Sequence, residues 1–89
     1  MAASDALKTK VKEMLVRQLR LKMAPGEIAD DASLFGDTGL GLDSIDVLEV
    51  VASVEKEFRV SIRSQEGEQV LRTVNTLADF LDQKGARAE

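Results

Sequence analysis

The stretch "GLGLDSIDVLEV", residues 39–50, holds the residue of this chain that is best placed for chemistry. Ser44 follows a loop rich in glycine and acid, and a strongly apolar run begins directly after it. A serine at such a junction is a helix cap, a nucleophile or the attachment point of another group. Capping is the simplest interpretation, because Asp43 or Ser44 could accept a bond from a free N–H of the first turn, worth about 1 kcal/mol.

The composition excludes most catalytic roles for Ser44. The 89 residues include no histidine and no cysteine. A hydrolytic serine would therefore lack its usual histidine base, and "LDSID" does not match the Gly-x-Ser-x-Gly turn of a nucleophile elbow. Disulfides and zinc sites built on Cys or His are excluded too. A calcium loop starting at Asp37 also fails, since Leu48 stands where such a loop needs glutamate. We expect neither an enzyme nor a bound metal.

Attachment of another group remains possible. A phosphodiester on Ser44 would lie at the first turn of a helix, where free N–H groups and the helix dipole favour negative charge. The glycines before it leave the serine accessible to a modifying enzyme. Capping and attachment are compatible, because Asp43 can cap the helix while Ser44 points outward.

Helices must position this junction. Residues 4–22 are predicted to form a first helix capped by Ser4 and ended by Pro25 and Gly26. Its apolar residues at helical spacing are Leu7, Val11, Met14, Leu15 and Leu19. The long connection up to residue 43 should be held on the core by its own apolar residues, which are Ile28, Leu34, Phe35, Leu40 and Leu42.

The second half of the chain predicts three more helices. Residues 44–58 form the second main helix, and "RVSI" is an extended link. Ser64 caps a short helix, and Thr73 caps the last one. The inner face of the last helix consists of Val74, Leu77, Phe80 and Leu81. We expect an all-α fold, a small bundle of three main helices plus a short one, in a single domain spanning 1–89 with an ordered core of about 4–83.

The helix over 44–58 has two apolar faces. On a wheel of about 100° per residue counted from Asp46, the expected core face spans roughly 40° to 140° and holds Val47, Val50, Val51, Val54 and Phe58. A second arc, at about 200° to 260°, holds Ile45, Leu48 and Ala52. The polar remainder comprises Asp46, Glu49, Ser53, Lys56 and Glu57. Either the long connection covers the second arc, or that arc is an exposed docking patch bordered by acids.

Charge restricts the possible partners. The formal net charge is −4, and residues 27–57 hold nine acidic side chains but one basic one. Such a field attracts basic protein surfaces and argues against nucleic acid. Half of the basic residues lie on the first helix, where we expect a solvated face: Lys8, Lys10, Lys12, Arg17, Arg20 and Lys22. No signal peptide or membrane-spanning run is evident, so we expect a cytoplasmic protein.

Residues 39–58, "GLGLDSIDVLEVVASVEKEF", resemble the attachment region of acyl carrier proteins. The usual pattern is a Gly/Leu loop, then Asp-Ser-Leu/Ile, then an acidic helix that ends in Glu-x-Phe. The likeness extends more weakly over nearly the whole chain, through "DDASLFGD" and "TVNTLADFL". It implies a four-helix carrier bundle whose Ser44 carries 4′-phosphopantetheine, transferred from coenzyme A by a separate phosphopantetheinyl transferase (holo-carrier synthase). The thiol of that group would hold acyl chains as thioesters.

The resemblance also implies roles for neighbouring residues. Asp43, Asp46 and Glu49 would meet basic residues on acyl-loading, condensing and acyl-transfer enzymes. The same enzymes would pack against Ile45, Leu48 and Ala52. A cavity for the acyl chain would be bordered by Val47, Val51 and Val54. The carrier is expected to be a monomer that itself catalyses nothing.

Departures from the family pattern suggest a dedicated carrier. Lys56 interrupts the acidic run, Arg59 and Arg63 flank the link, and the first helix is unusually basic. These features favour a specialised lipid, polyketide-like or cell-envelope pathway over general fatty acid synthesis. An aminoacyl or peptidyl carrier is a weaker match, because such carriers usually have a glycine pair before the modified dipeptide and fewer acids after it. An unmodified helical adaptor that binds a basic partner is the alternative from a different class.

Overall fold

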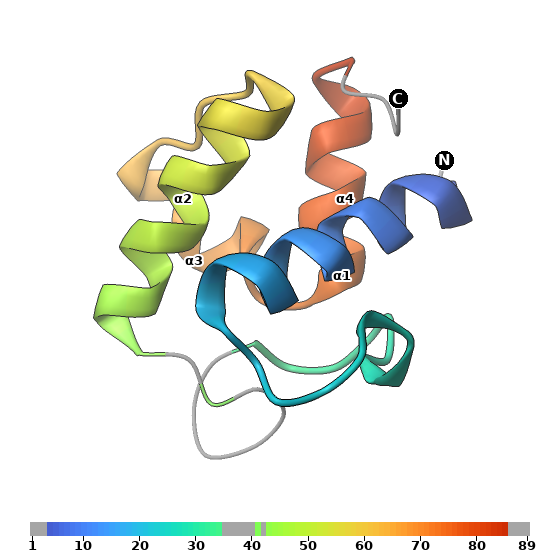
Figure 1. Cartoon of the computed structure of the whole chain (residues 1–89). Coiled ribbons are helices and arrows are strands. Elements are labelled where there is room, and N and C mark those ends of the chain that lie inside the picture. The colour runs from blue at the N-terminus through green and yellow to red at the C-terminus, as the bar shows by residue number, and fades with distance from the viewer. Residues whose placement is uncertain (1–3, 35–40, 42, 86–89) are drawn as a thin grey trace.

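The computed structural model of the chain describes residues 4–34, 41 and 43–85, without the side chains of Ser44, Ser64 and Glu68. Its elements are α1 (Asp5–Leu19), the 3₁₀ turn η1 (Pro25–Glu27), α2 (Ser44–Phe58), α3 (Ser64–Val70) and α4 (Val74–Gln83). Figure 1 shows α2 on the left and α4 on the right, with α1 crossing between them in front. The described residues form no β-strand, which confirms the predicted all-α bundle of three main helices and a short one.

The first helix begins as predicted but ends early. The Ser4 hydroxyl accepts a hydrogen bond from the Leu7 N–H at 3.2 Å, so Ser4 is the N-cap. Arg20 then adopts a left-handed backbone with φ 53°, and the Leu21 N–H bonds back to Val16. This left-handed residue ends the helix at Leu19. The helix predicted over residues 4–22 therefore ends three residues early, and Arg20 rather than Pro25 and Gly26 ends it.

The predicted inner face of α1 forms part of the core. Its fully buried side chains are Leu7, Val11, Met14 and Leu15, and Leu19 is half-buried. Ile28 and Leu34 of the long connection are buried as well, which confirms that this part of the connection is held on the core. Phe35, Leu40 and Leu42 lie outside the described residues.

Asp30, in the connection between α1 and α2, forms polar contacts with both α1 and α4. Its carboxylate accepts Lys12 Nζ at 2.6 Å and Lys8 Nζ at 3.5 Å, both from α1. Its carbonyl accepts the Asn75 N–H of α4 at 2.9 Å. The hydrogen bond from Lys12, together with the charges of Lys12 and Lys8, lowers the pKa of the Asp30 carboxyl against the opposing effect of desolvation. Polar contacts on both sides therefore hold the connection where it packs.

The second half of the chain follows the prediction with one correction. Thr73 caps α4, since its hydroxyl accepts the Thr76 N–H at 3.1 Å. Arg63, rather than Ser64, is the N-cap of α3, and its N–H donates to the Glu66 carboxylate at 3.1 Å. The inner face of α4 is buried at Val74, Leu77, Ala78 and Leu81, while Phe80 is half-buried.

One core joins the four helices. The helix α1 packs against both α2 and α4, and α3 packs against α4. Each long helix contributes fully buried side chains, and the link between α2 and α3 adds Val60 and Ile62. Burial of these aliphatic side chains supplies most of the driving force for folding in a chain with so few aromatic residues.

Candidate functional site

The candidate site lies at the first turn of α2. Asp43 is the N-cap, and its carboxylate accepts the N–H groups of Ile45 and Asp46, both at 3.0 Å. The Asp46 carboxylate in turn accepts the Asp43 N–H at 3.1 Å, which completes a capping box. Asp43 therefore satisfies two of the free donors of this turn, and the N-cap role belongs to Asp43 rather than to Ser44.

Ser44 is the first residue of α2. Its side chain lies outside the described part of the structure, so its outward orientation stays a prediction. The residues described around it, Gly41, Asp43 and Ile45, are all exposed. Gly41 has φ 65°, a left-handed conformation that glycine adopts without strain. The described residues on both sides of Ser44 are thus open to solvent.

The second apolar arc of α2 is exposed. Ile45 is 68% exposed and Leu48 is 70% exposed, and they are the large hydrophobic side chains most open to water in the described residues. Ala52, one turn beyond Leu48, is exposed as well. We call these three residues the apolar patch. Of the two interpretations left open by the sequence, this exposure favours a docking patch over a face covered by the connection.

The core face of α2 is rotated from its predicted position. Val50 and Val54 are fully buried, whereas Val47, Val51 and Phe58 are half-buried. Ser53, which the wheel placed on the polar face, is only 7% exposed. The buried centre therefore lies nearer Ser53 and Val50 than predicted. Glu57, one turn after Ser53, lies on the same side of α2, and its side chain pairs with α1.

Arg17 of α1 and Glu57 of α2 form an ion pair between the two helices. Gln18 Nε2 also donates to the Glu57 carboxylate, at 3.3 Å. The hydrogen bond from Arg17 to Glu57, reinforced by their opposite charges, raises the pKa of the Arg17 guanidinium. This contact joins the Ser53 and Glu57 side of α2 to α1. A helical wheel of α2 alone contains no signal for it.

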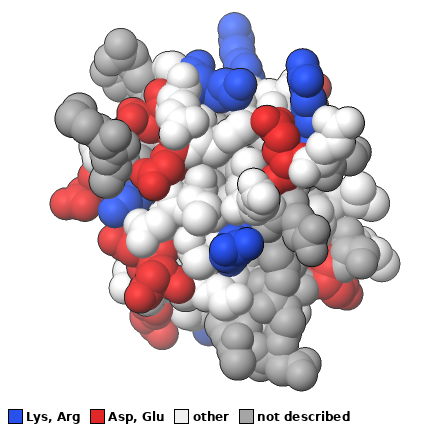
Figure 2. All heavy atoms as spheres, turned by 180° about the vertical axis from the view of Figure 1, so that it is seen from behind, with Lys and Arg blue, Asp and Glu red and all other residues white. Residues whose placement is uncertain are grey.

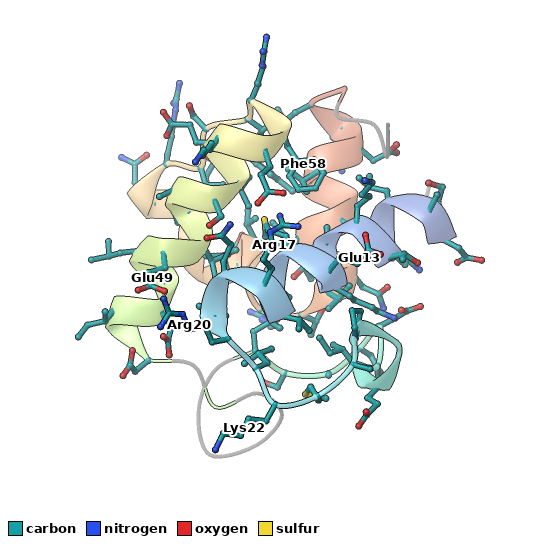
Figure 3. All side chains as sticks on the ribbon, viewed as in Figure 1. Glu13, Arg17, Arg20, Lys22, Glu49 and Phe58 are labelled. Carbon is teal, nitrogen blue, oxygen red and sulfur yellow. The ribbon has the colours of Figure 1, made fainter. Side chains whose placement is uncertain are left out.

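The predicted solvated face of α1 is only partly free. Lys8 and Lys12 are half-buried and pair with Asp30, so for them the prediction was wrong. Arg17 pairs with Glu57 but is exposed, as predicted. Lys10, Arg20 and Lys22 are exposed. Figure 3 shows Arg20 extending from the end of α1 toward the side of α2 that carries Glu49.

The predicted docking acids differ in their surroundings. Glu49 is exposed, and no described residue forms an ion pair with it. Asp46 is half-buried and already holds the capping bond to Asp43. Glu49 is therefore the acid of this turn that is freest to meet a partner.

Metal-binding and membrane-spanning features are both absent from the described part of the chain. Among these residues, no three Asp, Glu, His or Cys side chains come together in a way that could hold a metal ion. In the same residues, no helix combines the length and the apolar character needed to span a bilayer.

Comparison with known proteins identifies the family. Residues 9–81 match the family model described as "Phosphopantetheine attachment site". The chain is 38% identical to the acyl carrier protein of Bdellovibrio bacteriovorus over 80 residues, which is 90% of this chain and 96% of that protein. It is 31% identical to an acyl carrier protein of Buchnera aphidicola over 81 residues, 91% of this chain and 95% of that one. It is also 33% identical to acyl carrier protein 2, chloroplastic, of Spinacia oleracea over 84 residues, 91% of this chain and 58% of the plant protein. This chain therefore belongs to the acyl carrier protein family and is a non-enzymatic carrier with an attachment site for phosphopantetheine.

Proposed function

We propose that Ser44 carries the 4′-phosphopantetheine group and that the protein presents acyl chains, held as thioesters on its thiol, to separate enzymes. The observation that carries this proposal is that Asp43, and not Ser44, is the N-cap of α2. Asp43 caps the helix through two hydrogen bonds, and exposed neighbours surround Ser44. The phosphopantetheine group would supply the thiol that a chain without cysteine lacks.

The apolar patch and its acidic border form the docking surface in this proposal. Ile45, Leu48 and Ala52 would pack against partner enzymes, because burying such exposed apolar area favours association. Asp43, Asp46 and Glu49 would meet basic residues on those enzymes and steer the encounter. The partners are a phosphopantetheinyl transferase and enzymes that load, condense or transfer acyl groups.

We further propose that Val47, Val51 and Val54 border the space that shelters an acyl chain. Val54 is fully buried, and the other two valines are half-buried. An alkyl chain entering beside them would contact aliphatic side chains, which is favourable for an apolar cargo.

A specialised lipid, cell-envelope or polyketide-type pathway is the setting that we propose, in a cytoplasmic monomer that forms a single carrier domain. The exposed bases near the end of α2, Lys56, Arg59 and Arg63, support a dedicated set of partners. Charge differences at a docking surface are an effective way to discriminate between partners.

Incubation with coenzyme A and a promiscuous phosphopantetheinyl transferase tests the attachment site. Mass spectrometry of the intact protein should show one added phosphopantetheinyl group, and Ser44→Ala should abolish it. Ser61→Ala is the matched control, since Ser61 is an exposed serine outside α2 and its loss should leave modification unchanged. An unchanged mass, under conditions that modify a known carrier, would support an unmodified helical adaptor instead.

A further inference from the structure

A shallow polar groove lies at the end of the molecule opposite the candidate attachment site. It has a volume of about 480 Å³ and is lined by Arg59, Val60, Ser61, Arg63, Glu66 and Lys84. We call it the basic groove. Arg59 directly follows the last residue of α2, so a helix of 15 residues separates it from the start of that helix at Ser44. At 1.5 Å per residue, that separation is roughly 22 Å.

The groove carries positive charge on an acidic protein. Arg59, Arg63 and Lys84 are all exposed, and none of them forms an ion pair with a described residue. The one carboxylate in the lining, Glu66, accepts the backbone N–H of Arg63. Figure 2 shows lysine and arginine side chains gathered at the top of this face, at the end of the molecule where α2 and α4 finish in Figure 1. Lys84 Nζ also lies 5.4 Å from the centre of the Phe80 ring. Arg59 and Arg63 are therefore available to a ligand, and the exposed Lys84 lines the same groove.

One wall of the groove has the pattern of a free strand edge. Val60 and Ile62 are buried, while Arg59, Ser61 and Arg63 between and beside them are exposed. This alternation with a period of two is that of a β-strand with one face on the core. Yet no backbone hydrogen bond joins Val60, Ser61 or Ile62 to another described segment. An exposed backbone with unpaired groups can accept a further extended chain.

We propose that the basic groove is a second docking site, which takes an extended acidic segment of a partner protein. Carboxylates on alternate residues of such a segment would face Arg59, Arg63 and Lys84, and its backbone would pair with the link at Ser61. Because the groove is far from Ser44, a partner could hold the carrier there while an enzyme works at the attachment site. This inference goes beyond the proposed carrier function and does not depend on which serine is modified.

Two other anionic ligands fit the groove less well. An anionic bilayer is much broader than the groove and would also face the acids outside it, whereas a single segment contacts the groove alone. The most exposed large hydrophobic residues that could enter a bilayer, Ile45 and Leu48, lie near the other end of α2. A single small anion would gain little, because all three cations are exposed to water and each exposed ion pair is weak. A segment that contacts several cations and the backbone at once adds these weak contacts together.

The test is a fluorescence anisotropy titration at low salt, in which the purified protein is added to a labelled peptide of alternating glutamate and threonine, about ten residues long. We expect saturable binding, and at least tenfold weaker binding by the double variant Arg59→Asn/Arg63→Gln. Asparagine is chosen at 59 because it tolerates the left-handed backbone found there, with φ 57°. Amide NMR shifts on adding the peptide should be largest from Arg59 to Arg63 and at Lys84.

The matched control is Lys10→Gln/Lys22→Gln, which removes two exposed cations from the region of α1. It should change binding less than twofold, and circular dichroism should show both double variants folded. Equal weakening by the two pairs would mean non-specific attraction and would overturn the proposal. So would absence of peptide binding, whether or not phosphatidylserine vesicles or inorganic phosphate bind in the groove instead.

Discussion

Asp43 is the N-cap of α2 and Ser44 is its first helical residue, although either residue type could cap a helix. Both aspartate and serine are strong N-caps, so the dipeptide alone leaves the cap unassigned. The backbone decides it, because the chain enters α2 with Asp43 extended and its carboxylate over the N–H groups of Ile45 and Asp46. Ser44 then occupies the first helical position, and the N-cap is Asp43.

Core positions within α2 differ in how deeply each valine is buried, and a pair of substitutions tests this. Val54→Ala removes a side chain with no exposed area and should lower the free energy of unfolding by about 2 kcal/mol. Val51→Ala, at a half-buried position, should cost about half as much. Midpoints of urea unfolding at constant slope measure both losses. Equal losses of unfolding free energy in the two variants would support the core face predicted from the helical wheel and would contradict its rotation.

At the scale of the element, α2 presents three surfaces with separate tasks. One faces the core, one carries the apolar patch, and one pairs with α1 through Arg17 and Glu57. If the patch docks enzymes, Glu49→Lys should slow modification by a phosphopantetheinyl transferase about tenfold, because it places a like charge before a basic surface.

Stability should be unaffected by Glu49→Lys, because Glu49 is exposed and unpaired among the described residues. The matched control is Glu13→Lys, the same change of charge at an exposed position of α1. Steady-state rates with coenzyme A measure the effect. Identical rates for Glu49→Lys and wild type would remove this acid from the docking surface.

The connection between α1 and α2 depends on Asp30, and pH tests this contact. The pKa of Asp30 is lowered in the folded protein, from an ordinary value of 3.8, by Lys12 first and then by Lys8. Its contribution to stability is therefore present above pH 3.8 and is lost as the pH falls below that value through the folded pKa.

Asp30→Asn removes the charge on which this contact depends. The variant should unfold at lower denaturant than wild type at neutral pH, and the difference should vanish once the pH falls below the lowered pKa of Asp30. Asp31→Asn is the control, since Asp31 is exposed and joins no ion pair among the described residues. A difference between Asp30→Asn and wild type that persists unchanged in strong acid would exclude the ion pairs as its source.

At the scale of the whole molecule, charge is strongly segregated. Residues 27–57 hold nine acids against one base, and the basic groove lies beyond the end of α2. Repulsion among the acids destabilises the fold, so added magnesium should raise the melting temperature by a few degrees through screening.

Sodium chloride at equal ionic strength should reproduce most of the rise caused by magnesium, because the described residues contain no cluster suited to a metal. Calorimetry in the two salts measures both effects. A melting temperature that neither salt changes would show that the repulsion is negligible.

The sequence by itself determined the helices, the caps at Ser4 and Thr73, and the membership in a carrier family. These depend on local periodicity, on short capping motifs and on the "LDSID" region, all of which are readable along the chain. The exposure of Ile45 and Leu48 was one of two interpretations that the sequence left open. The single domain and the role of Ser44 stay predictions.

Tertiary structure alone decided which face of α2 is buried and which bases are free. Those outcomes depend on contacts between segments far apart in sequence, such as Lys12 with Asp30 and Arg17 with Glu57. The energy of such contacts depends on distances that periodicity does not encode. Local patterns therefore predicted where each helix lies in the chain, while packing set its rotation and the charges left for partners.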